Sequence, residues 1–319
     1  MRVLITGMGG ELGTRVANLL EADDDVEAIC GVDIEPPRRR LTRAEFHRID
    51  PRNRIRTGEV VHRFRPTAVA HLGMYEPNAR SDPKAALERT ASGTIAALGA
   101  AEGCGTVDRI VVRSGIEVYG RRKGSPAVPD EDAALDPTTA WGHSLRHAEM
   151  IARETGLATG ATVTLLRTAP LVGPHFPSPL GRVLRQLLVP LSPHDPSFCV
   201  LHQEDAAGAL VAALRQPFDG PVNVVGEGST TVARAVLAGR RLPLLVWGPG
   251  WRPARAVAEL TGAPIPEHVQ ELLRCGRLAA GDRVQERIGF TPASSTREVI
   301  DQLYAWPEVT YLTPKVDAA

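Results

Sequence analysis

The sequence predicts an α/β protein built on a doubly wound parallel sheet, with a smaller C-terminal domain beside it. Short apolar strands alternate with helical segments as far as Gly173, and this alternation places helices on both faces of a parallel sheet. A glycine-rich turn separates the first strand from the first helix. After Gly173 the alternation weakens and proline becomes frequent, which indicates a different kind of domain.

Each element has its own signal. Buried strands are expected where apolar and β-branched residues run together, at 3–6, 26–33, 46–49, 67–72, 110–112 and 162–167. Helices are expected between them, over 11–21, 52–65, 82–102 and 140–155. Asp82-Pro83 marks one helix start, because aspartate caps helices and proline suits the first turn. Further along, 205–216 is expected to be helical and 221–225 to be a strand that returns to the main sheet.

The turn after the first strand, residues 6–13, has the sequence TGMGGELG. Gly7 permits the tight turn, Gly10 lets the backbone approach a pyrophosphate, and Gly13 lets the helix pack closely on the strand. Asp33 ends the second strand, where an acidic side chain binds a ribose 2′-hydroxyl. These features predict a Rossmann-type dinucleotide site. NAD is favoured over NADP, because Asp33 would repel a 2′-phosphate.

The predicted domain division follows from this placement. Residues 1–173 form the NAD(P)-binding Rossmann domain, and residues 198–226 return to it. The proline-rich segment 174–197 and residues 227–319 form a smaller domain on the substrate side.

The TGxxGxxG spacing resembles the short-chain dehydrogenase/reductase superfamily, and the whole chain resembles its extended branch, the NAD-dependent epimerase/dehydratase family. The matching stretches occur in the family's order, at Ile49-Asp50, Ala70 to Gly73, Gly93-Thr94, Glu117 to Gly120, Leu166-Arg167, Gly173-Pro174, His202 to Asp205 and Asn223 to Gly226. The arginine-rich, lysine-poor composition is similar to that of an actinobacterial subset. The resemblance implies that the cofactor contacts Gly7, Gly9, Gly10, Glu11, Leu12, Gly13, Asp33, Asp50, Leu72 and Gly73.

The resemblance also implies a catalytic serine or threonine, a tyrosine, and a lysine four residues after that tyrosine. Gly115, Trp141 and Leu145 occupy these three positions here. Lysine occurs only at 84, 123 and 315, so no change of alignment restores the tyrosine–lysine pair. The position before the HxxD motif, where nucleotide-sugar epimerases of the family carry an arginine, is Phe198.

Three residues are candidate substitutes for the catalytic groups. Glu117 stands where the family's sugar dehydratases carry a catalytic glutamate, and burial would raise the pKa of such a carboxyl group. His143 shares a helix face with His147 near the missing lysine, and Tyr75 follows the fourth strand where the family's substrate cleft opens. A structural role for Glu117 and a polar or dimer-facing role for the histidines stay open. No third ligand accompanies the histidines, so no metal is predicted.

Composition limits the partners and the compartment. The 37 basic and 37 acidic side chains cancel, which disfavours nucleic-acid and anionic-membrane partners. Four widely spaced cysteines fit a reduced compartment, and no apolar run is long enough to span a membrane. A cytoplasmic protein that binds a small molecule is therefore expected. By analogy with the family, helices near 83–102 and 139–156 would pair two copies into a homodimer.

Three functions stay open. The first is an NAD-binding enzyme with non-standard acid–base chemistry on a small, apolar substrate, working as an oxidoreductase, isomerase or lyase. The second is a catalytically inert dinucleotide-binding sensor or scaffold. The third is a nucleotide-sugar epimerase with a substitute base.

Overall fold

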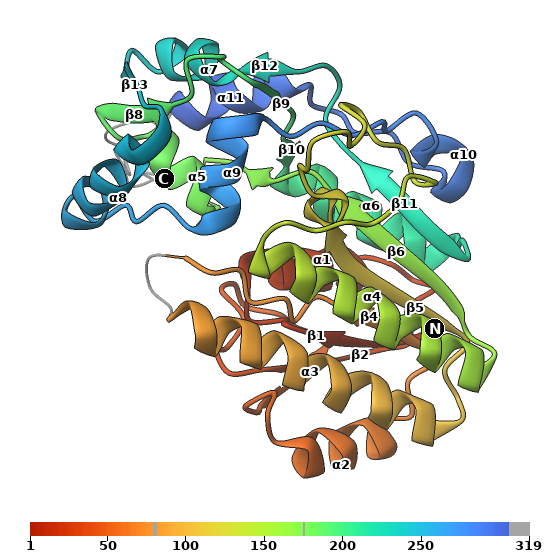
Figure 1. Cartoon of the computed structure of the whole chain (residues 1–319). Coiled ribbons are helices and arrows are strands. Elements are labelled where there is room, and N and C mark those ends of the chain that lie inside the picture. The colour runs from red at the N-terminus through yellow and green to blue at the C-terminus, as the bar shows by residue number, and fades with distance from the viewer. Residues whose placement is uncertain (79–81, 175, 306–319) are drawn as a thin grey trace, which may run out of the picture.

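The computed structural model describes residues 1–78, 82–174 and 176–305. Its centre is a seven-stranded sheet with the order β11-β6-β5-β4-β1-β2-β3, in which every neighbouring pair is parallel (Figure 1). The strands are β1 (Arg2–Thr6), β2 (Ala28–Asp33), β3 (Ala44–Arg48), β4 (Ala68–His71), β5 (Arg109–Gly115), β6 (Thr162–Thr168) and β11 (Gly220–Val224). The doubly wound α/β sheet expected from the alternation is confirmed.

Helices cover both faces of the sheet. One face packs against α1 (Glu11–Glu21) and α6 (Gln203–Arg215) around a core that includes Val16 and Leu210. The opposite face packs against α2 (Arg54–Phe64), α3 (Pro83–Cys104) and α4 (Ala140–Thr159). In Figure 1, α3 and α4 lie in front of the strands and α2 lies at the bottom. Both cores are apolar because the parallel strands are buried on both sides.

The expected elements are present, and the difference that bears on the site concerns β5. The apolar run predicts only 110–112, whereas β5 continues to Gly115 and passes into a short 3₁₀ helix, η1 (Ile116–Tyr119). Ser114 and Gly115 extend the strand by pairing with Arg167 and Thr168 of β6. The apolar pattern does not predict this extension, because residues 113–115 are polar or glycine. Their backbone groups still pair with β6, and the Ser114 hydroxyl donates to Glu149.

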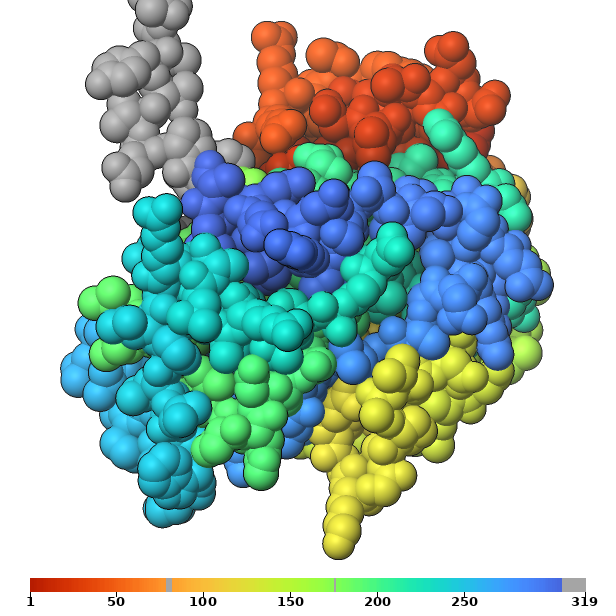
Figure 2. Space-filling view, turned by 90° about the horizontal axis from the view of Figure 1, so that it is seen from above, coloured from red at the N-terminus to blue at the C-terminus, as the bar shows by residue number. Residues whose placement is uncertain are grey.

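A second apolar core lies above the sheet in Figure 1. It is built from α5 (Pro179–Leu184), β8 (Leu188–Leu191), α7 (Val232–Ala238), α8 (Trp251–Leu260), α9 (Glu267–Cys275) and α11 (Thr296–Tyr304). The more exposed β13 (Leu242–Leu245) pairs with β8. Short strand pairs, β7 (Leu171–Val172) with β10 (Leu201–His202) and β9 (Ser197–Phe198) with β12 (Thr230–Thr231), connect this part to the main body. Seen from above, the C-terminal residues in cyan and blue form most of the face in Figure 2.

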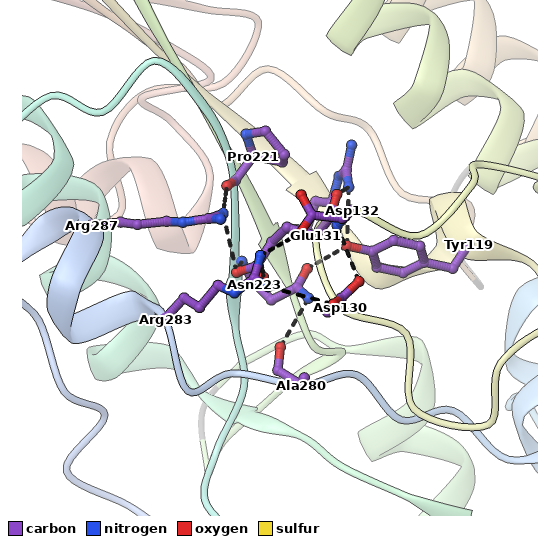
Figure 3. A network of polar contacts seen from close by, with 10 residues as sticks. Tyr119, Asp130, Glu131, Asp132, Pro221, Asn223, Ala280, Arg283 and Arg287 are labelled. Carbon is purple, nitrogen blue, oxygen red and sulfur yellow. Dashed lines mark hydrogen bonds and ion pairs between the residues drawn. The ribbon is translucent and has the colours of Figure 1, made fainter.

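One helix of the C-terminal segment belongs to the main core. Val284 and Ile288 of α10 (Val284–Ile288) are buried with residues of α6 and β11. Arg283 directly precedes this helix and Arg287 lies in its last turn. Their guanidinium groups face the carboxylate of Glu131 at 3.7 and 3.5 Å, respectively (Figure 3). The segment 227–319 is therefore divided between the two cores, as far as the structure describes it.

A polar network joins the loop after η1 to β11. The Tyr119 hydroxyl donates to Asn223 Oδ1 at 2.7 Å, and the Asn223 backbone N–H donates to Glu131 at 3.0 Å (Figure 3). The Asn223 side-chain amide donates to the carbonyl of Ala280 at 2.9 Å. Because these groups are buried and paired, the network fixes the loop, the sheet edge and the C-terminal segment together.

Candidate functional site

The glycine turn lies where the sheet changes direction. β1 pairs with β2 on one side and β4 on the other, so the chain leaves β1 at the switch point where doubly wound folds bind their ligands. Gly7 has a φ of +74°, and a Cβ atom there would lie 2.8 Å from the backbone of Gly73. A Cβ atom on Gly13 would collide with the carbonyl of Gly7. The turn therefore requires glycine for steric reasons.

Asp33 faces this turn from the end of β2. Its carboxylate accepts hydrogen bonds from the backbone N–H groups of Gly9 at 2.9 Å and Ile34 at 2.7 Å. The Tyr75 hydroxyl donates to the same carboxylate at 3.0 Å. Burial raises the pKa of Asp33, and these hydrogen bonds oppose that effect in part.

A cavity of about 340 Å³ runs along the turn. Nine of the ten residues expected to contact the cofactor line it: Gly7, Gly9, Gly10, Glu11, Leu12, Gly13, Asp33, Leu72 and Gly73. Four arginines also line it, namely Arg38, Arg89, Arg113 and Arg182. Arg89, Arg113 and Arg182 come from three separate elements and share no motif, so no sequence pattern predicts them at the cavity.

The tenth expected contact, Asp50, lies outside this cavity. Its side chain is 40% exposed and forms an ion pair with Arg52 at 2.7 Å. Hydrogen bonds from Arg52 lower the pKa of Asp50 to about 2. Its neighbour Ile49 instead lines a small cavity of about 20 Å³ behind Asp33.

The three candidate catalytic residues lie in three different environments. Tyr75 directs its hydroxyl to Asp33, at the cofactor end of the cleft. Glu117 is 6% exposed and lines none of the cavities described for residues 1–305. His143 is exposed on α4, because it lies on the helix face opposite the buried Trp141 and Leu145. The structure does not bring the three together.

The three positions that the resemblance assigns to the family's catalytic groups are filled by core packing. Trp141 and Leu145 are 4% and 1% exposed and belong to the apolar core that contains Ile116 and Val118. A side chain at Gly115 would collide with the carboxylate of Glu117 and lie 3.1 Å from Leu145 Cδ1. No side chain larger than hydrogen fits there without movement of Glu117.

A charged group beside this filled region was not predicted. Glu76 lines the cavity, and its Oε1 is 3.0 Å from His268 Nε2, while its Oε2 lies 3.8 Å from Arg113. His268 is 5% exposed, and its ring centroid is 6.1 Å from that of Trp141. Burial alone would raise the pKa of Glu76, but the hydrogen bond with His268 and the charge of Arg113 outweigh it and lower that pKa. His268 comes from α9, so no local sequence signal could link it to Glu76.

Two other features have some of the properties of a site. A cavity of about 680 Å³ between β8, β13 and α8 is larger than the cleft, but no titratable side chain lines it. Cys30, Glu45 and His47 place their ligand atoms within 4.8 Å of one another. The Arg63 guanidinium lies 3.3 Å from both Glu45 and His47, and burial raises the pKa of Cys30 to about 12. Both facts oppose a cation there, because a thiol must lose its proton to bind a metal.

No helix among the described residues is long and apolar enough to cross a membrane. That finding accords with the absence of a long apolar run in the sequence.

Curated relatives cover almost the whole chain. Uncharacterized proteins of Mycobacterium tuberculosis (Rv0501) and Mycobacterium bovis (Mb0513) are each 29% identical to it over 336 residues. The match covers 99% of this chain and 85% of each relative.

Solved structures share the fold. The UDP-glucose 4-epimerase of Thermus thermophilus, in complex with NAD, matches with a TM-score of 0.73 at 23% identity and covers 95% of this chain and 98% of that one. The UDP-glucuronic acid 4-epimerase of Bacillus cereus, in complex with NAD, matches with a TM-score of 0.71 at 17% identity, over 96% and 97% of the two chains. The family model described as the NAD dependent epimerase/dehydratase family matches residues 3–226. The chain therefore belongs to the NAD dependent epimerase/dehydratase family.

Proposed function

We propose that the protein binds NAD in the glycine-turn cleft and catalyses a reaction of a small substrate in which Glu76 moves the proton. The observation that carries this proposal is the cavity itself, which runs from Gly7 and Asp33 to Glu76 and Arg113. The cofactor end and an ionisable end thus share one space, whereas the tyrosine and lysine of the family are absent.

NAD fits the residues of the cofactor end. The glycines leave room for a pyrophosphate at the N-terminus of α1, and Asp33 offers a carboxylate to the adenosine ribose. Arg89 lines the cavity, and its buried Nε has no hydrogen-bond acceptor among the described residues. A phosphate oxygen would supply that acceptor. When bound, NAD supplies a hydride acceptor or donor; NADP is disfavoured by the charge of Asp33.

The other end of the cavity suits a small substrate with an apolar body and an anionic group. Met74, Phe176 and Pro177 form an apolar wall, and Arg113 and Arg182 supply positive charge. Glu76 Oε1 is engaged by His268, but Oε2 is 3.8 Å from Arg113, too far for a hydrogen bond. This oxygen is available to accept a substrate proton, while His268 orients the carboxylate.

A second candidate is the inert sensor or scaffold, favoured by the burial of Trp141 and Leu145 where the family places its proton relay. The nucleotide-sugar epimerase gains no such support, because Phe198 replaces the family's arginine and is fully buried. The homodimer expected from the family remains a prediction that native mass spectrometry would test.

The test begins with isothermal titration of NAD and NADP into the purified protein. Turnover is then screened over small carboxylates, hydroxy acids and nucleotide sugars, with wild type, Glu76→Gln and the exposed control Glu59→Gln. We expect NAD binding by all three proteins and loss of turnover of at least about a hundredfold only in Glu76→Gln. NAD binding without any turnover would favour the sensor, and unchanged turnover in Glu76→Gln would remove Glu76 from the reaction.

A further inference from the structure

The cleft is divided in two at the place where an adenosine ribose would lie. The larger cavity follows the glycine turn, and the smaller one lies between the ends of β1, β2 and α3. Four residues line both cavities: Gly7, Asp33, Gly73 and Tyr75. Of these, Asp33 and Tyr75 have side chains that meet, through the hydrogen bond of 3.0 Å between the Tyr75 hydroxyl and Asp33 Oδ1.

Tyr75 is held in this position from both ends. Its backbone N–H donates to Thr90 Oγ1 at 2.9 Å, and Thr90 is fully buried on α3. Its hydroxyl donates to a carboxylate whose two oxygens already accept the N–H groups of Gly9 and Ile34. A hydrogen bond from a hydroxyl to an ionised acceptor is among the stronger neutral-donor bonds in proteins.

We propose that Tyr75 is an internal gate of the dinucleotide site, whose hydroxyl occupies the place of a ribose hydroxyl on Asp33. A ribose bound to Asp33 and the Tyr75 phenol are both hydroxyl donors to one acceptor, so they compete for it. A dinucleotide that spans both cavities must break the Tyr75–Asp33 bond and turn the phenol aside. Access of NAD is therefore coupled to the movement of one side chain.

This inference deepens the proposed NAD binding and depends on it. It assigns Tyr75 a role opposite to that of a cofactor-binding or catalytic tyrosine. A residue that holds NAD weakens binding when it is truncated, whereas a gate strengthens binding. The sign of the change separates the two roles.

The experiment measures NAD binding by titration calorimetry and stopped-flow fluorescence for wild type, Tyr75→Phe and Tyr75→Ala. Tyr304→Phe is the matched control, because its hydroxyl donates at 3.0 Å to the carbonyl of Leu184 in the second core, away from the cleft. We expect Tyr75→Phe to lower the Kd about tenfold, since the competing hydrogen bond to a charged group is lost. The wild-type association rate should level off at high NAD concentration, and that of Tyr75→Phe should rise linearly.

The outcomes distinguish the gate from the proposed function. Equal Kd values for wild type and Tyr75→Phe, or weaker binding by Tyr75→Phe, overturn the gate and leave NAD binding intact. Binding by Tyr75→Ala alone also overturns the gate as proposed, because it shows that the ring and not the hydroxyl excludes NAD. If wild type, Tyr75→Phe and Tyr75→Ala all fail to bind NAD, and circular dichroism shows each to be folded, both proposals are overturned together.

Discussion

Two neighbouring regions at the same edge of one sheet are organised in opposite ways. One is the cofactor end of the cleft, and the other, here called the relay end, comprises positions 115, 141 and 145, where the resemblance places the family's proton relay. At the cofactor end, glycines leave space and Asp33 presents a carboxylate to a cavity. At the relay end, Gly115 is overlaid by Glu117, and Trp141 and Leu145 have joined the core. The difference teaches that neighbouring positions at one sheet edge can be organised independently, since one group leaves a cavity that suits a dinucleotide and the other is packed without one.

The largest effect is expected from restoring the family's lysine at the relay end. Leu145→Lys places an ammonium group in a site that is 1% exposed, and we expect a loss of about 4 kcal/mol in the free energy of unfolding. Urea denaturation measures this loss. Arg146→Lys, on the exposed face of the same helix, should leave stability unchanged within about 0.5 kcal/mol. An equally stable Leu145→Lys protein would show that the relay end is open and would remove the contrast.

The matching change at the cofactor end is Gly9→Ala. A Cβ atom there collides with the carbonyl of Glu35 and lies 3.1 Å from Asp33 Oδ2, so the turn must shift. We expect NAD binding to weaken about a hundredfold, measured by calorimetry. Gly58→Ala is the control, because nothing lies within 4 Å of its Cβ position in α2. That change should stabilise the protein by up to about 1 kcal/mol and leave the Kd of NAD unaltered.

The dependence of stability on pH tests how well the cofactor end is shielded from water, through His71. His71 is fully buried between Thr6 and Thr94, and burial lowers its pKa to about 4. The unfolded chain binds a proton near pH 6.5, so stability decreases as the pH falls below 6.5 and stops decreasing near pH 4. Between pH 7 and pH 5 this histidine should account for a loss of about 2 kcal/mol.

Proton NMR of the imidazoles, with urea denaturation at each pH, measures this effect. His71→Gln should flatten the profile. Titration of His71 near its ordinary value would mean that the cofactor end is more hydrated than the structure indicates.

The smallest effect concerns cofactor choice. Asp33→Asn removes the charge that would repel a 2′-phosphate, and we expect NAD binding to weaken about tenfold while the preference over NADP narrows. Parallel calorimetry with both cofactors checks this. Tighter binding of NADP than NAD by the unaltered protein would refute the assignment of Asp33.

Sequence patterns were sufficient for the sheet and for most of the cofactor end, because both depend on local signals. The turn of Gly7 to Gly13 and the end of β2 at Asp33 lie within a single strand–helix–strand unit. The absence of the family's tyrosine–lysine pair stays a prediction, which depends on the rarity of lysine in the chain. The contacts of Glu117 with Gly115 and of His268 with Trp141 could not be predicted from the sequence, because they depend on tertiary packing. Tyr75 was assigned to the right loop, but its rotamer, and therefore its contact with Asp33, is not encoded in any pattern.

The contact between Glu76 and His268 has a consequence for how the protein folds. It joins residues separated by 192 positions, so its formation must wait for closure of a very long loop of chain. During synthesis, α9 leaves the ribosome after every strand of the main sheet. The seven strands of the main sheet can thus pair while the ionisable end of the cleft is still incomplete, and any chemistry at Glu76 begins only once α9 is in place.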